Sequence, residues 1–144
     1  MLYRNSKSEI RNSKQTQNPK SETQNQVKAE NPKPYNLGKR TLEFAKRAIS
    51  YVNKLPKTMP NMEVGKQLVR SAGSIGANYI EAEDSLSKKD FVMRIKIARK
   101  ESKETIYWLN LSEPPDAQRD EKDSLLQEAT ELMKIFGAIA NKSK

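Results

Sequence analysis

The segment covering residues 70–82 keeps the apolar spacing of an α-helix although two glycines and two serines lie within it. A glycine inside a helix costs roughly 1 kcal/mol relative to alanine, so Gly73 and Gly76 indicate that another backbone comes very close there. The apolar side chains recur in steps of three and four residues, at Val64, Leu68, Ala72, Ile75, Tyr79, Ala82 and Leu86. We therefore expect a packing helix over residues 61–86, which leaves functional chemistry to other residues.

Three further segments have helical apolar spacing. The first runs from about residue 37 to residue 53 and has the stripe Leu42, Ala45, Ile49 and Val52, widened by Phe44, Ala48 and Tyr51. Another is expected to bury Phe91, Ile95, Ala98, Ser102, Ile106 and Leu109. The last begins around residues 116–120 and is expected to bury Leu125, Ala129, Leu132, Phe136 and Ile139.

Prolines and capping residues separate these segments. Pro56 ends the first helix and Pro114 ends the third, while Asn61 and Ser87 are expected to cap the second and third helices. Connections this short cannot cross a bundle, so consecutive helices must be antiparallel. The sequence predicts an all-α protein, an antiparallel up-down-up-down four-helix bundle over residues 35–144.

The first 34 residues repeat a polar unit of six to seven residues, with Asn-Ser-Lys at 5–7 and 12–14 and Asn-Pro-Lys at 18–20 and 31–33. Such a unit cannot bury an apolar face, so we expect a disordered arm. With seven basic and three acidic residues, the arm could follow a phosphate backbone. Alternatively, it is translated repetitive DNA or begins at an upstream start codon, and we favour this interpretation.

Histidine and cysteine are both absent. Their absence rules out disulfides, the usual zinc ligands and nucleophiles activated by histidine, so we expect no enzyme, no metal and no cofactor. The acidic residues Glu81, Glu83 and Asp84 do not change this expectation, because adjacent helical positions point apart. The apolar runs are short and the N-terminus is polar, which predicts a cytoplasmic protein without a membrane span.

The formal net charge of +9 favours a polyanionic partner, and the basic residues concentrate in two of the predicted helices. Residues 37–57 contain six basic residues and one acidic residue, and residues 88–112 contain seven and three. The candidate nucleic-acid-binding residues are Lys39, Arg40, Lys46, Arg47, Lys89, Lys96, Arg99, Lys100 and Lys103. Because Glu104 follows Lys100 by one turn, an ordinary solvated face remains the alternative.

Two other groups of side chains have both a structural and a functional interpretation. Arg70, Ser74, Asn78 and Glu81 could form a binding site, but we favour hydrogen bonds across the bundle or between subunits. Tyr107 and Trp108 could stack on bases, but aromatic residues on a bundle helix more often belong to the core or to an interface.

Residues 66–82 and 86–91 resemble the bacterial four-helix-bundle proteins encoded in intervening sequences of 23S ribosomal RNA genes, and their retroelement relatives. Segments 94–101 and 125–132 also resemble that family, whereas the repeat arm has no counterpart and residues 110–118 match less closely. The resemblance implies a homopentamer and no catalytic residues. For the retroelement relatives it implies binding of nucleic acid and of a reverse transcriptase.

From these observations we expect a small, non-enzymatic, oligomeric bundle. Its basic surface would bind RNA, DNA or a nucleoprotein partner through phosphate contacts, without base specificity. The alternative is a protein–protein interaction scaffold in which the positive charge serves solubility only.

Overall fold

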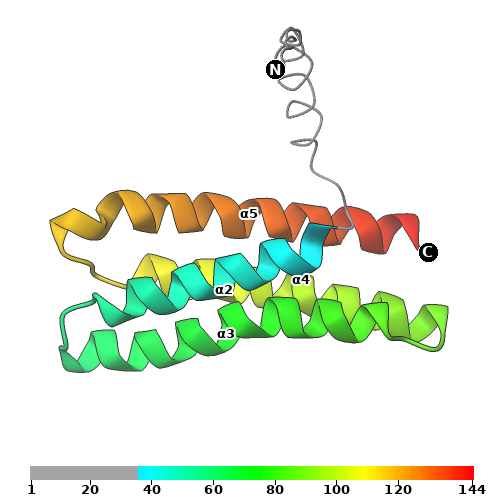
Figure 1. Cartoon of the computed structure of the whole chain (residues 1–144), viewed down its shortest axis with the longest axis horizontal. Coiled ribbons are helices and arrows are strands. Elements are labelled where there is room, and N and C mark those ends of the chain that lie inside the picture. The colour runs from blue at the N-terminus through cyan, green and yellow to red at the C-terminus, as the bar shows by residue number, and fades with distance from the viewer. Residues whose placement is uncertain (1–35) are drawn as a thin grey trace, which may run out of the picture. The chain divides into compact units, whose positions relative to one another are not determined.

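The computed structural model describes residues 36–144, most of which lie in four α-helices. These are α2 (Leu37–Asn53), α3 (Met59–Glu83), α4 (Lys88–Leu111) and α5 (Arg119–Lys142), with a 3-10 turn, η2 (Asp116–Gln118), before α5. Each helix packs on the next along the chain and α2 also contacts α5, which closes the antiparallel bundle (Figure 1). The predicted all-α four-helix bundle is confirmed. The predicted disordered arm, residues 1–34, lies outside the described residues.

Hydroxyl side chains fix the starts of α3 and α4. Thr58 is the N-cap of α3, and its side chain accepts a hydrogen bond from the backbone N–H of Asn61 at 3.2 Å. The expectation that Asn61 is the cap was therefore wrong by three residues. Ser87 caps α4 as predicted, because its hydroxyl oxygen accepts from the N–H of Asp90 at 3.1 Å.

Asn61 instead joins two loops at one end of the bundle. Its buried amide Nδ2 donates to the carbonyl oxygens of Pro56 and Glu113, each at 3.2 Å, and its Oδ1 accepts from the N–H of Glu113 at 3.1 Å. Nearby, the hydroxyls of Tyr51 and Ser112 share a 2.6 Å hydrogen bond. A buried polar side chain needs such partners, and here they tie the α2–α3 loop to the α4–α5 loop.

The core face of α2 differs from the prediction. Phe44, Ala48 and Tyr51 are at most 1% exposed, whereas Leu42 and Ile49, from the stripe expected to lead, are 53% and 46% exposed. The helix has two adjacent apolar stripes, and the bundle closes on the one with the aromatic rings because these bury more area. Of the other stripe, Leu42 and Ile49 are left on the surface, while Ala45 and Val52 are half-buried.

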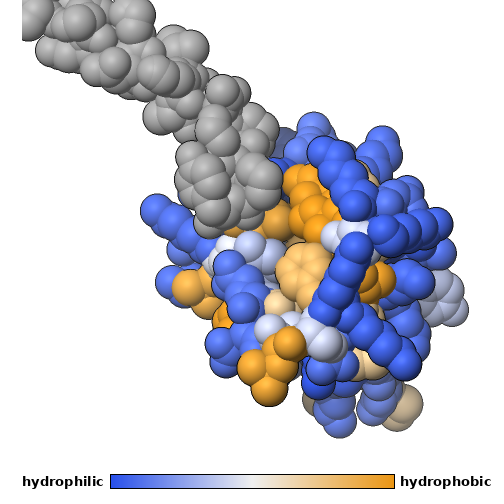
Figure 2. Space-filling view, turned by 90° about the vertical axis from the view of Figure 1, so that its right-hand side faces the viewer, coloured by the Kyte–Doolittle hydropathy of each residue, from blue (hydrophilic) through white to orange (hydrophobic). Residues whose placement is uncertain are grey.

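The remaining helices bury most of the side chains that the spacing selects. The buried positions are Leu68, Ala72, Ile75, Tyr79 and Ala82 of α3, Ile95, Ala98, Ser102, Thr105 and Leu109 of α4, and Leu125, Ala129, Leu132, Phe136 and Ala140 of α5. Leu86 is an exception at 98% exposed, because α3 ends at Glu83 and leaves it in the turn. Four other side chains expected in the core are only half-buried, namely Val64, Phe91, Ile106 and Ile139. In the end-on view of Figure 2, hydrophilic side chains form most of the outer margin, with apolar ones between them.

The two glycines of the packing helix have different surroundings. A Cβ atom added at Gly76 would lie 2.8 Å from Thr41 Oγ1 and 3.1 Å from Thr41 Cβ, so α2 and α3 approach closely there, as predicted. A Cβ at Gly73 would meet no atom within 4 Å, so the predicted close approach at Gly73 is wrong within one copy of the chain. Gly65 is a second point of close approach, because a Cβ there would lie 2.9 Å from Val52 Cγ1.

Within residues 36–144, none of the helices combines the length and the apolar character that a membrane span requires.

The contrast between the two glycines gives a stability prediction. The Gly76→Ala variant should have a free energy of unfolding about 1–3 kcal/mol below that of Gly73→Ala, because only the first overpacks the α2–α3 contact. Thr41 cannot turn away freely, since its hydroxyl donates to the Leu37 carbonyl oxygen at 2.8 Å. Both variants gain the same helix propensity, so urea unfolding isolates the contact. Equal stabilities would contradict the close packing at Gly76.

Candidate nucleic-acid interface

The outer side of α4 presents four exposed lysines, Lys89, Lys96, Lys100 and Lys103, which we call the lysine face. Their spacings of seven, four and three residues keep them on one side of the helix, away from the buried Ile95 and Ala98. Apolar side chains lie among them, because Val92, Met93 and Ile97 line a hollow of about 480 Å³ together with Lys89, Lys96 and Lys100. The lysine face is therefore a mixed cationic and apolar surface.

The carboxylates of α4 do not neutralise these lysines. Glu104 and Glu101 instead pair with Arg70 of α3, whose Nη2 lies 2.9 Å and 3.4 Å from their respective Oε1 atoms. None of the ion pairs among residues 36–144 includes a residue of the lysine face. The four lysines therefore face solvent without an ion-pair partner from the described part of the chain, although the Glu104 carboxylate lines one hollow with Lys100 and Lys103.

The arginines of α2 have a different environment. Arg40 donates to both carboxylate oxygens of Glu128, at 2.6 and 2.9 Å, and to Glu131 at 2.8 Å. The hydrogen bond with Glu128 raises the pKa of Arg40. Arg47 pairs with Glu121 at 3.1 Å and donates to the hydroxyl of Ser124 at 2.7 Å. Both arginines thus connect α2 to α5. The charge pattern of the sequence alone does not predict these contacts, because the partners are far apart in the chain.

The structure does not join the basic residues of α2 and α4 into one surface of a single chain. Helices α2 and α4 stand at opposite corners of the bundle, since each packs between α3 and α5. Lys46 is exposed and forms a weak 3.7 Å pair with Glu43, and no ion pair of the described residues includes Lys39. Arg99 lies at the side of α4 that faces α5, where its Nε would be 3.3 Å from a Cβ at Gly137.

Two of the four polar residues on α3 reach across to α4. Arg70 does so through the pairs described above, and Asn78 Oδ1 accepts a hydrogen bond from Arg94 Nη1 at 3.1 Å. Ser74 bonds within its own helix, donating to the Arg70 carbonyl oxygen at 2.9 Å. Glu81 is exposed, and its backbone carbonyl oxygen accepts hydrogen bonds from the hydroxyl of Ser85 at 3.1 Å and from the N–H of Asp84 at 3.2 Å. Arg94 was not singled out from the sequence.

The two adjacent aromatic residues of α4 differ in exposure. Tyr107 is 59% exposed, whereas Trp108 is half-buried and packs against the core. Their rings meet edge to face, with centroids 5.0 Å apart and an interplanar angle of 78°. Tyr107 also lines a hollow of about 350 Å³ together with Lys96, Arg99, Lys100, Lys103 and Glu104. An aromatic ring therefore lies at one end of the lysine face.

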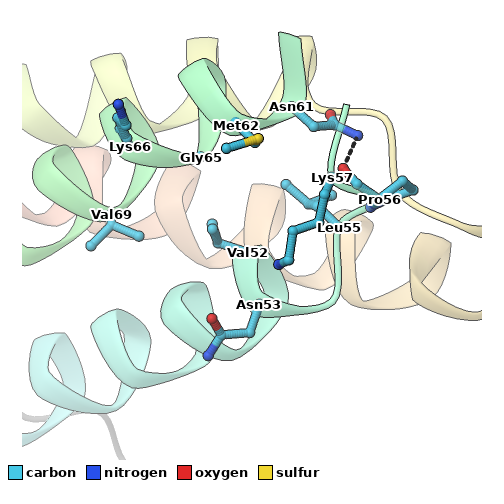
Figure 3. Close-up of a pocket in the computed structure, with 10 residues that line it drawn as sticks. All are labelled: Val52, Asn53, Leu55, Pro56, Lys57, Asn61, Met62, Gly65, Lys66 and Val69. Atoms are coloured by element: carbon cyan, nitrogen blue, oxygen red, sulfur yellow. Dashed lines mark hydrogen bonds between the residues drawn. The ribbon is translucent and has the colours of Figure 1, made fainter. Parts of the chain in front are cut away.

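A third hollow, of about 600 Å³, lies at the turn of the hairpin formed by α2 and α3 (Figure 3). Its lining comes from the end of α2, the connecting loop and the start of α3, and includes Val52, Leu55, Met62 and Val69.

Among the described residues, no group of three or more acidic, histidine or cysteine side chains is placed to hold a metal ion.

The fold and the lysine face together define a class: an antiparallel four-helix bundle with a basic outer helix. A family described as 23S rRNA-intervening sequence protein matches residues 34–138, and the chain belongs to this family. A solved structure from Bacteroides thetaiotaomicron VPI-5482, described as a protein with unknown function from the S23 ribosomal protein family, is 34% identical. Its similarity covers 72% of this chain and 96% of that one, with a TM-score of 0.62. No curated protein matches the chain.

The contacts of Arg40 can be tested by removing its charge. Arg40→Gln should lower the free energy of unfolding by about 1–2 kcal/mol, because Glu128, whose side chain is 20% exposed, loses a two-point partner. Lys39→Gln is the matched control, with the same charge change and an expected effect within about 0.5 kcal/mol. Similar losses in both variants, measured by urea unfolding, would argue against a specific α2–α5 contact.

Proposed function

We propose that this protein is a non-enzymatic, oligomeric helical bundle of the cytoplasm that binds RNA or DNA through the lysine face. The observation that supports this most strongly is the distribution of charge. The arginines of α2 and α3 pair with the carboxylates of α5 and α4, while the four lysines of the lysine face have no ion-pair partner among the described residues. A phosphate backbone would supply the missing negative charge.

The spacing of these lysines favours phosphate contacts over base recognition. Lys96 and Lys100 are one turn apart, and like charges at this spacing destabilise a helix by a few tenths of a kcal/mol unless an anion relieves the repulsion. Each lysine is a flexible point charge, which suits an irregular row of phosphates and lacks the fixed geometry used to read base edges. We therefore propose binding without base specificity.

The proposed binding also accords with the family, whose description names 23S rRNA. That name refers to the place of the coding sequence and not to a ligand, so the charge distribution remains the main argument. By the family resemblance, a reverse transcriptase or another nucleoprotein is the protein partner we would test first.

A second candidate function is a protein–protein scaffold, favoured by the exposed apolar residues among the charges. Met93, Tyr107 and Leu111 of α4 are 47–59% exposed, so this helix could also bind a protein surface. The two functions differ in their response to salt, because only phosphate binding releases several counterions.

We also propose that copies of the chain assemble into the homopentamer that the family resemblance implies, through the outer side of α2 and α3. Leu42 and Ile49 of α2 and Met62 of α3 are about half exposed, and a Cβ added at Gly73 would meet no atom of another part of the described chain within 4 Å. A second copy would cover these apolar side chains and approach the helix closely at the glycine.

Salt titration tests the proposed nucleic-acid binding. The affinity for a generic RNA or DNA oligonucleotide should fall steeply with salt, with a slope of about −0.7 in log–log terms for each single-strand phosphate neutralised. The triple variant Lys96→Glu, Lys100→Glu, Lys103→Glu should flatten this slope by about two and weaken binding at least tenfold. Fluorescence anisotropy at several salt concentrations measures both quantities.

The matched control carries the same charge change elsewhere, as Lys54→Glu, Lys57→Glu, Lys134→Glu. We expect this control to retain most of the wild-type affinity, because these lysines lie off α4. Equal losses in the two triple variants would show that only the net charge matters, and a flat salt response of the wild type would exclude the proposed function.

Assembly has its own test at Gly73. The Gly73→Leu variant should remain helical, since the position is open within one chain, but its mass in solution should fall from that of the oligomer to that of smaller species. Light scattering after size-exclusion chromatography gives the mass, and circular dichroism checks the fold. An unchanged oligomer would place the interface elsewhere.

A further inference from the structure

The exposure of Tyr107 is unusual among the aromatic side chains of the described residues. Phe44, Tyr51, Tyr79 and Phe136 are each less than a tenth exposed, and the other aromatic residues of α4 are half-buried. Tyr107 is 59% exposed. Its ring does not contribute to the core, so packing within one chain does not explain an aromatic residue at this position.

The ring lies beside the lysines that we propose as the phosphate contacts. Tyr107 follows Lys103 by four residues and Lys100 by seven, so the three share one side of α4. Along the helix axis, Tyr107 is therefore about 6 Å from Lys103 and about 10 Å from Lys100. The same residues line the hollow of about 350 Å³, so the ring and the ammonium groups face one volume of solvent.

Trp108 supports the ring from the side of the core. Its indole packs against the core and meets Tyr107 edge to face, at a centroid distance of 5.0 Å. Such contacts are worth about 0.5–1.5 kcal/mol beyond area burial, so they restrict the tyrosine ring while leaving much of it open to solvent. A restricted, exposed aromatic ring next to cations is the arrangement on which single-strand binders stack bases.

We propose that Tyr107 is a stacking platform for an unpaired base, so that the lysine face takes single-stranded RNA or DNA. This inference rests on the proposed function, because the lysines must hold the phosphate backbone for a base to reach the ring. In a duplex both faces of a base are covered by its neighbours, whereas a single strand offers them. Every base has a flat face, so stacking adds affinity without sequence specificity.

The experiment separates stacking from phosphate contact by means of a ligand without bases. The full-length protein is titrated with a fluorescein-labelled twelve-nucleotide oligo-dT and with an abasic deoxyribose-phosphate oligomer of the same length and charge. Tyr107→Leu should bind oligo-dT about tenfold more weakly and the abasic oligomer as the wild type does. Tyr107→Phe, the matched control, should bind both as the wild type does, and circular dichroism verifies the helical content of each variant.

The outcomes distinguish stacking at Tyr107 from phosphate binding by the lysine face. If the wild type binds both ligands and Tyr107→Leu weakens neither or both equally, stacking at Tyr107 is excluded while phosphate binding stands. If the wild type binds neither ligand, the proposed function itself fails. A twelve-base-pair duplex that binds more tightly than oligo-dT would also overturn the preference for single strands.

Discussion

Ion pairs between neighbouring helices determine where this bundle carries its unneutralised charge. Arg40 and Arg47 fasten α2 to the carboxylates of α5, and Arg70 fastens α3 to Glu101 and Glu104 of α4. The more exposed pairs, those of Arg47 and Arg70, contribute little stability each, so their main consequence is the charge distribution. The planar guanidinium binds a carboxylate at two points, whereas a lysine ammonium has no such fixed geometry. The closest ion pairs between helices are therefore those of the arginines, and the lysine face is left facing solvent.

The fold could be predicted from the sequence because helical periodicity and capping residues depend on near neighbours in the chain. Ser87, the prolines and the stripes of α3, α4 and α5 were interpreted correctly for this reason. The predictions that depend on how the helices pack against one another were wrong in part. Spacing alone could not show which of two apolar stripes on α2 faces the core, or that Gly76 meets Thr41 while Gly73 stays open. Asn61 was wrongly expected to cap α3, because the bonds that it makes instead, to Glu113, join segments far apart in sequence.

The candidate site shows the same division. The lysine face could be predicted because its members lie on one helix, where spacing fixes their relative positions. The partner of Glu104 could not be predicted. In the sequence Glu104 lies one turn from Lys100, and only the register of α3 against α4 shows that it pairs with Arg70 instead. For the same reason the basic residues of α2 and α4 were both candidates from the sequence, although the two helices occupy opposite corners of the bundle.

The central claim is that the unneutralised lysines of α4 are the contact with nucleic acid. Its most direct test is a residue-by-residue acetylation footprint of the full-length protein, with and without a saturating oligonucleotide, read by mass spectrometry. We expect Lys96, Lys100 and Lys103 to be protected from acetylation, while Lys54 and Lys134 react as in the free protein. Protection of Lys54 and Lys134 with none along α4 would contradict it.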